Sequence, residues 1–266
     1  MIYPTLLCNT GLGDLYVLLG AMVYLAKKHG GLRIPALPQY IRIVRKCLIF
    51  HPEIVPFEIL NDAAMLKDYR DAKHVIRCHW TSIAQSEKDT HKGISWDHWQ
   101  YKVLGVPFDE RWNSCPLEKA ASIETQIIFP GPYYLVHEDP ERGFPILYPP
   151  WHPVITTRRV ATYGKYSPLS WCEAIRQAKE LHFIDSSMWH LAESITIRSN
   201  IPQPKYLHRY VRPFHSTWHA IETRYHWQYI DGTPTPYIDP ENLTDVKKWD
   251  NDTAEAAESS RAEAMG

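Results

Sequence analysis

The stretch Asn9-Thr10-Gly11-Leu12-Gly13-Asp14 joins an apolar run, residues 2–8, to a long segment of helical periodicity, residues 15–29. The run is apolar apart from Thr5, which predicts a buried parallel strand. The second segment predicts a helix that ends before Gly30 and Gly31. A glycine turn that opens directly into a helix aims backbone N–H groups and the positive end of the helix dipole at one point. This geometry suits an anion or a reacting hydroxyl.

Asp14 admits two interpretations. A carboxylate in the first helical turn is favoured by the helix dipole in any case, so it could be a simple cap. It is also placed to act as a general base at the mouth of a site. The two glycines are explained equally well by a tight strand-to-helix connection alone. Both interpretations stay open on the sequence alone.

Length and composition narrow the class of protein. A chain of 266 residues suits one large or two small α/β lobes, and 29 basic against 30 acidic residues exclude a global basic field for nucleic acid. Five scattered cysteines without a Cys-x-x-Cys pair argue against a disulfide framework or zinc ribbon and predict a reducing, cytoplasmic location. The longest apolar stretch, residues 15–26, is too short for membrane insertion. The 10 Trp and 16 Tyr fit a carbohydrate or nucleoside binder.

The expected organisation is an N-terminal lobe at 1–125, a second lobe at 131–212, a terminal helix within 213–232 and a disordered tail at 233–266. The boundary falls where Pro116, a polar stretch and Pro130-Gly131-Pro132 follow one another. Further strands are expected at 32–35, 57–60, 74–78, 133–137, 154–160, 182–184 and 205–210, and helices at 40–50, 62–69, 168–179 and 218–227.

The segment 79–112 is rich in Trp and His in a polar context. Packing under a long loop explains such residues better than direct ligand contact. His91 and His98 lie seven residues apart without carboxylate framing, which excludes a metal helix between them.

A second strand-turn-helix repeats the logic of the first. The expected strand 182–184 runs through Asp185, Ser186 and Ser187 into a helix that contains Met188 and His190. The two serine hydroxyls beside free helix N–H groups predict an anion cradle. Arg142, in the charged loop after the strand 133–137, and Arg158 or Arg159 are expected to reach the same phosphates. A salt bridge to Glu138 or Asp139 is an equally good explanation of Arg142.

Several nucleotide-binding and hydrolase motifs are absent. The chain has no Walker lysine, and Tyr16 replaces the third glycine of Gly-x-Gly-x-x-Gly. No Gly-x-Ser-x-Gly occurs either. These absences argue against an NTPase, a dinucleotide-dependent dehydrogenase and a serine hydrolase.

The two turns resemble the hallmark segments of the ADP-heptose type (family 9-like) of GT-B glycosyltransferases and of small phage and bacterial relatives. The matching residues are Gly11-Leu12-Gly13-Asp14 and Asp185-Ser186-Ser187-Met188-Trp189-His190-Leu191-Ala192. The resemblance covers only these motifs. It implies an α/β fold of two Rossmann-like lobes with a cleft between them.

The resemblance also implies roles for residues. Asp14 would be the catalytic base, and Ser186, Ser187 and Met188 would contact the donor diphosphate together with Gly11 and Gly13. The family's phosphate-binding lysine has no secure counterpart, so Arg142 is the expected substitute. Asp185 and His190 complete the expected donor side, although turn capping and a satisfied helix histidine explain them as well.

The predicted function is transfer of a sugar from a nucleotide-diphosphate donor to a hydroxyl acceptor, either a glycan or a hydroxymethylated DNA base. No cofactor is expected, and no metal, because the two expected lobes contain no Asp-x-Asp; Asp250-Asn251-Asp252 belongs to the expected tail. A nucleotide-sugar epimerase or hydrolase is the first alternative. A non-catalytic DNA- or glycan-binding module is the second, with 80–112 and basic Arg42, Arg45 and Lys46 as its surface.

Overall fold

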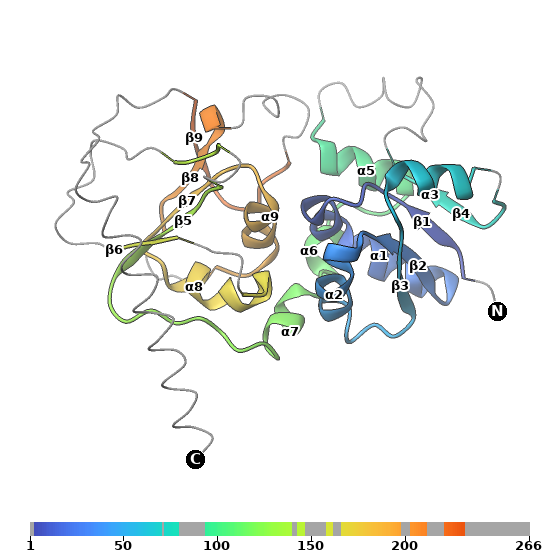
Figure 1. The fold of residues 1–266 in the computed structure, drawn as a ribbon, viewed down its shortest axis with the longest axis horizontal. Helices are drawn as coiled ribbons and strands as arrows, with labels where there is room; N and C mark the ends of the chain where they lie inside the picture. Colours follow the sequence, from blue (N-terminus) through green and yellow to red (C-terminus); the bar gives the residue numbers. More distant parts are fainter. Residues whose placement is uncertain are drawn as a thin grey trace, which may run out of the picture. The chain divides into compact units, whose positions relative to one another are not determined.

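The computed structural model describes residues 3–70, 72–79, 94–139, 143–146, 158–161, 166–197, 203–211 and 221–231, with the backbone alone at 158–161. All of these residues belong to one compact unit. Within them the chain forms two parallel β-sheets with helices beside each (Figure 1).

The first sheet has four parallel strands in the order β3-β2-β1-β4. Its central strand β1 (Thr5–Leu7) pairs with β2 (Leu32–Ala36) and β4 (Val75–Arg77), and β3 (Ile54–Glu58) lies at one edge. The connecting helices are α1 (Leu12–His29), α2 (Pro38–Cys47) and α3 (Asp62–Asp68). The expected alternation of strands and helices is confirmed here, although the third strand begins three residues earlier than predicted.

Helix α1 forms the centre of the core. It is buried at nearly every position from Leu15 to Ala26, and it ends at Gly30, whose φ of 71° is in the left-handed region that glycine favours. A Cβ at Gly20 would lie 2.0 Å from the carbonyl oxygen of Glu110. A glycine at this position therefore allows α6 (Glu110–Asn113) to pack directly on the backbone of α1.

The second sheet has five parallel strands in the order β6-β5-β7-β8-β9. They are β6 (Arg158–Ala161), β5 (Tyr133–His137), β7 (Glu180–Phe183), β8 (Lys205–His208) and β9 (Gln228–Ile230). The 3-10 turn η3 (Pro168–Trp171) leads into α8 (Cys172–Gln177), α9 (Ser187–Ser194) follows β7, and the turn η4 (Arg209–Val211) follows β8. Both sheets are thus open and parallel, as the sequence predicts.

Between the two sheets in sequence lie α5 (Trp96–Leu104), α6 and α7 (Leu117–Ala121). Trp99 is fully buried and Trp96 is 8% exposed, and their rings stack at 5.1 Å. Both rings are therefore packed in the protein interior, as the sequence predicts for this segment. Trp80 and His91, from the same predicted segment, lie outside the described residues.

The predicted terminal helix is wrong over residues 221–231. Residues 221–227 form no helix, and 228–230 form β9, which pairs with β8. The backbone N–H of Glu222 donates to the Asp97 carboxylate and that of Arg224 to the Glu193 carboxylate. Since these N–H groups bond to side chains of α5 and α9, they are not available for helical bonds. Residues 212–220 and the predicted tail at 233–266 lie outside the described residues.

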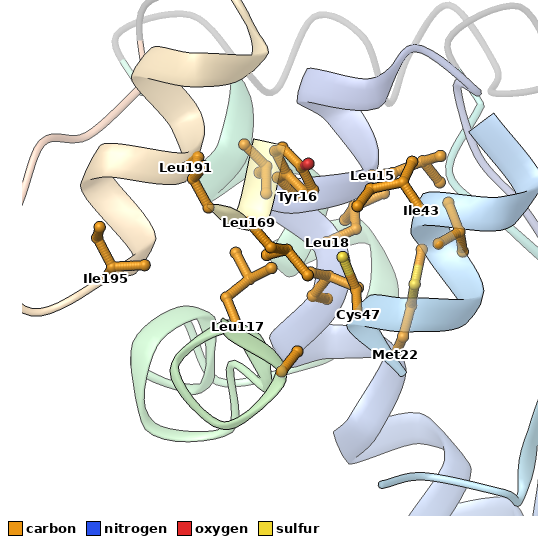
Figure 2. Close-up of a cluster of buried hydrophobic side chains, with 14 of the residues drawn as sticks. Leu15, Tyr16, Leu18, Met22, Ile43, Cys47, Leu117, Leu169, Leu191 and Ile195 are labelled. Atoms are coloured by element: carbon orange, nitrogen blue, oxygen red, sulfur yellow. The ribbon is translucent and has the colours of Figure 1, made fainter. Parts of the chain in front are cut away.

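One hydrophobic cluster links helices beside the two sheets. Figure 2 shows Tyr16 and Leu18 of α1 in the same cluster as Leu191 of α9, with Leu117 of α7 and Leu169 of η3. Each of these five side chains is at most 1% exposed. The buried contact therefore fixes α1 beside α9. In the part of the chain described, no helix is both long and apolar enough to span a bilayer.

Candidate functional site

The first turns of α1 and α9 lie against each other. A Cβ built on Gly13 would lie 2.6 Å from His190 Cδ2 and 3.6 Å from Ser187 Cα. The absence of a side chain at Gly13 therefore allows the two helix N-termini to approach. The two turns that the sequence singles out separately meet at one place.

The turn before α9 ends in an N-cap residue whose side chain makes no cap hydrogen bond. Ser186 is the N-cap residue, with extended backbone angles (φ −163°, ψ 171°), and its backbone carbonyl accepts the N–H of His190. The Ser186 hydroxyl is buried and has no hydrogen-bond partner within the described residues. A buried hydroxyl without a partner costs free energy unless a ligand or water satisfies it.

The other predicted residues of this turn differ in what they offer. The Met188 side chain is 5% exposed and packs in the hydrophobic core, so only its backbone faces the turn. His190 Nε2 lies 3.9 Å from Asp185 Oδ1, and both side chains are mostly buried. This geometry fits the structural interpretation of the Asp185–His190 pair.

Of the two predicted arginines, the structure describes only the backbone of Arg158. Arg142 lies outside the described residues. The backbone of Arg158 begins β6 and pairs with Tyr133, the first residue of β5. Helix α9 follows the carboxyl end of β7, whereas Arg158 begins the parallel strand β6. The backbone of Arg158 therefore lies at the amino ends of the strands, opposite to the end where α9 starts.

Asp14 lies in the first turn of α1 and is half-buried. Trp96 donates its indole N–H to Asp14 Oδ1 at 3.3 Å. Burial, with a smaller contribution from the charge of Asp62, raises the pKa of Asp14 to about 6, while hydrogen bonds from Trp96 and Asn9 and the nearby His79 oppose this shift. A carboxyl whose pKa approaches neutrality is suited to general-base work.

Sequence reasoning missed a second polar cluster, made of Thr10, Asp62 and His79. The Thr10 hydroxyl donates to Asp62 Oδ1, and His79 Nε2 lies 3.2 Å from Asp62 Oδ2. Burial by itself raises the pKa of Asp62, but the hydrogen bonds from His79 and Thr10 and the charge of His79 outweigh it and lower that pKa. Asp14 and Asp62 are therefore shifted in opposite directions, a pattern that separates a base from a permanent anion.

A signal for this cluster was present in the sequence. Thr10 follows β1, Asp62 opens α3 after β3, and His79 follows β4. The carboxyl ends of parallel strands share one edge of a sheet, where ligands bind in open α/β folds. The polar residue after each predicted strand was thus a candidate for the functional site.

Two buried cysteines lie near this cluster. Cys8 and Cys78 carry free, buried thiols, and burial raises the pKa of each well above its ordinary value, so both are neutral. Within the described residues, no group of three or more His, Cys, Asp or Glu side chains is arranged to hold a metal ion.

Comparison with known proteins gives two structural similarities. No family model matches the chain, and no curated protein is similar in sequence. One similar structure is the iron-containing dodecameric glycosyltransferase TibC from enterotoxigenic E. coli, at 15% identity and a TM-score of 0.44 over 77% of this chain and 58% of that chain. The chain thus spans less than two thirds of the length of TibC.

The other is a family 9 glycosyl transferase from Veillonella parvula, at 11% identity and a TM-score of 0.45 over 92% of this chain and 91% of that chain.

Proposed function

We propose that the protein is a glycosyltransferase that moves a sugar from a nucleotide-diphosphate donor to a hydroxyl acceptor. The proposal depends on one observation, the contact of Gly13 with Ser187 and His190. Asp14 is the next residue after Gly13, so in this proposal its carboxylate and the N-terminus of α9 act on one bound substrate. One helix start then supplies a base, and the other supplies N–H donors for an anion. The motif resemblance of the two turns supports the same function.

In the proposed reaction Asp14 accepts the proton of the acceptor hydroxyl. The acceptor oxygen forms a bond to the anomeric carbon as the bond from that carbon to the diphosphate oxygen breaks. The leaving diphosphate takes the electron pair and gains negative charge. In this proposal, N–H groups at the start of α9 and the Ser186 hydroxyl stabilise this charge, because a helix N-terminus and its hydrogen-bond donors favour an anion.

The proposed donor side consists of Ser186, Ser187 and the backbone of Met188, next to Gly11 and Gly13. Asp185 and His190 hold the turn in shape through their 3.9 Å pair. Arg142 stays a proposed phosphate ligand on the sequence alone. The acceptor is a glycan or a hydroxymethylated DNA base, since each presents a hydroxyl.

We also propose that the transfer needs no metal and takes place in the cytoplasm. Free thiols at all five cysteines agree with a reducing compartment. The chain has one Asp-x-Asp motif, Asp250-Asn251-Asp252, which lies outside the described residues. Binding of a metal ion by this motif would contradict metal independence.

Calorimetric titration with UDP, GDP and ADP tests the proposal, each with and without EDTA. We expect one of the three to bind, with an affinity that EDTA leaves unchanged. If none binds, the proposed function is wrong. If EDTA abolishes binding, the proposed metal independence is wrong. Donor turnover without any acceptor would instead favour the hydrolase or epimerase.

A further inference from the structure

We propose that Trp96 and Gly11 are positioning residues that orient Asp14, so that Oδ1 is held and Oδ2 is left open to take the proton. Trp96 acts through its indole N–H, and Gly11 acts through the space left by its missing side chain. The inference rests on the proposed function for the role of Asp14 as a base. The orientation itself is measurable without any substrate.

The Trp96 indole is held firmly in place. It stacks on Trp99 at 5.1 Å with an interplanar angle of 24°, and Trp99 is fully buried. The next residue, Asp97, forms a fully buried ion pair with Arg111, which also donates to the carbonyl of Glu222 at 2.8 Å. Because the start of α5 is fixed on both sides, the direction of the indole N–H toward Asp14 Oδ1 is fixed as well.

Gly11 faces the other carboxylate oxygen. A Cβ at Gly11 would lie 2.8 Å from Asp14 Oδ2 and 3.8 Å from Asp14 Cγ. The backbone angles of Gly11, φ −59° and ψ 140°, are open to any L-residue, so the conformation does not require glycine. Gly11 is exposed, and among the described residues a Cβ built on it meets only Oδ2 and Cγ of Asp14 within 4 Å, so the protein leaves space beside Oδ2 on this side.

Other groups near Asp14 set the background for its titration. Asp62 on α3 disfavours the ionised form of Asp14, and His79 after β4 favours it. Cys8 after β1 and Cys78 after β4 are buried neutral thiols. The hydrogen bonds from Trp96 and Asn9 stabilise the carboxylate. Removal of the Trp96 N–H alone therefore raises the pKa of Asp14 further.

The test is a pH titration of the Asp14 carboxyl by carbon-13 NMR on aspartate-labelled full-length protein, with the resonance assigned by Asp14→Asn. Trp96→Phe keeps a stacking ring but loses the N–H, and we expect the pKa of Asp14 to rise by about one unit. Trp112→Phe is the matched control, because the Trp112 indole N–H is buried without a hydrogen-bond partner in the described part of the chain. It should leave the titration unchanged. An unchanged Asp14 titration in folded Trp96→Phe would overturn the inference.

Gly11→Ala is the second variant, and it decides the question if Trp96→Phe does not fold. Its methyl group would cover Oδ2 and exclude water from it, so we expect the melting temperature to stay close to wild type, the pKa of Asp14 to rise, and transfer to fall by about 10- to 100-fold. A wild-type rate in Gly11→Ala would also overturn the inference. The proposed function fails separately, if no nucleoside diphosphate binds the wild type. A shifted titration in Trp96→Phe without any nucleotide binding would keep the orientation of Asp14 and reject its role in transfer.

Discussion

The start of α1 and the start of α9 are built by the same local rule and offer different chemistry. Each follows a parallel strand and begins with a small residue, Gly11 or Ser186. At α1 the first turn carries Asp14, whose pKa is raised to about 6. At α9 the first turn carries no acidic residue, and its N-cap hydroxyl has no partner within the described residues.

This difference shows how one supersecondary unit can serve two ends of a reaction. A carboxylate placed at a helix N-terminus satisfies the helix dipole internally, and it is then available as a base when burial raises its pKa. A serine N-cap leaves the dipole to attract an external anion. In the proposed reaction, proton transfer therefore belongs to the α1 turn and charge stabilisation to the α9 turn.

The largest effect is expected from Asp14→Asn. If the α1 turn handles the proton alone, sugar transfer falls by about 100- to 10,000-fold, because the base is lost. Nucleoside diphosphate affinity, measured by calorimetry, should stay within about twofold, since no charge is added to or removed from the α9 turn. A large loss of nucleotide affinity would show that Asp14 also takes part in nucleotide binding, so that the two turns do not have separate roles.

The same substitution should stabilise the fold in a pH-dependent way. The folded pKa of Asp14 is raised from 3.8 to about 6, so the stability that its neutral form contributes is complete below pH 4 and is lost as pH rises through 6. Asparagine does not ionise. The free energy of unfolding of Asp14→Asn should therefore be up to about 3 kcal/mol higher than that of wild type at pH 8. Near pH 3 the two proteins should be equally stable. Urea unfolding at both pH values measures this; a constant difference would contradict the raised pKa.

Gly13→Ala tests whether the two turns need their close approach. Its methyl group would lie 2.6 Å from His190 Cδ2, so the ring must move or the helices must separate. We expect a loss of about 1–3 kcal/mol in unfolding free energy together with weaker nucleotide binding. Differential scanning calorimetry and nucleotide titration on the same sample provide both values. A variant as stable as wild type would mean that the contact is easily relieved.

The smallest effect belongs to the Ser186 hydroxyl. Ser186→Ala removes a buried group that has no partner in the described structure, so stability should be unchanged or slightly higher, while nucleoside diphosphate affinity falls by about tenfold. Ser167→Ala is the matched control, since the Ser167 hydroxyl is also buried without a partner and is the N-cap of η3. Equal nucleotide affinities in the two variants would remove Ser186 from the site.

The sequence predicted the two turns because glycine, serine and helical periodicity are local signals. Helix α1 and its end at Gly30 agree with the expected positions, and the turn through Ser186 into α9 does as well. The partners of Asp14 were not predicted, since Trp96 follows it by 82 residues and reaches it only through the packing of α5. Asp62 and His79 were missed for the same reason, because sheet order decides which strand ends are neighbours.

The error in the C-terminal part has a different cause. Apolar residues there recur at helical spacing, but buried carboxylates of Asp97 and Glu193 accept the backbone N–H groups of Glu222 and Arg224. Side chains distant in sequence thus overrule the local preference. Arg158 shows the same limit, since its place at the amino end of β6 follows from strand register alone.

The segment 221–227 has a practical consequence for anyone who shortens this chain. Asp97, Glu193 and Arg111 are at most 1% exposed, and each is bonded by this segment: Glu222 N–H to Asp97, the indole N–H of Trp227 to Glu193, and Arg111 to the Glu222 carbonyl. An expression clone that stops after Val211 would remove these hydrogen bonds from three buried charged side chains. Residues 221–227 are therefore part of the folded body, and a shortened chain should keep them.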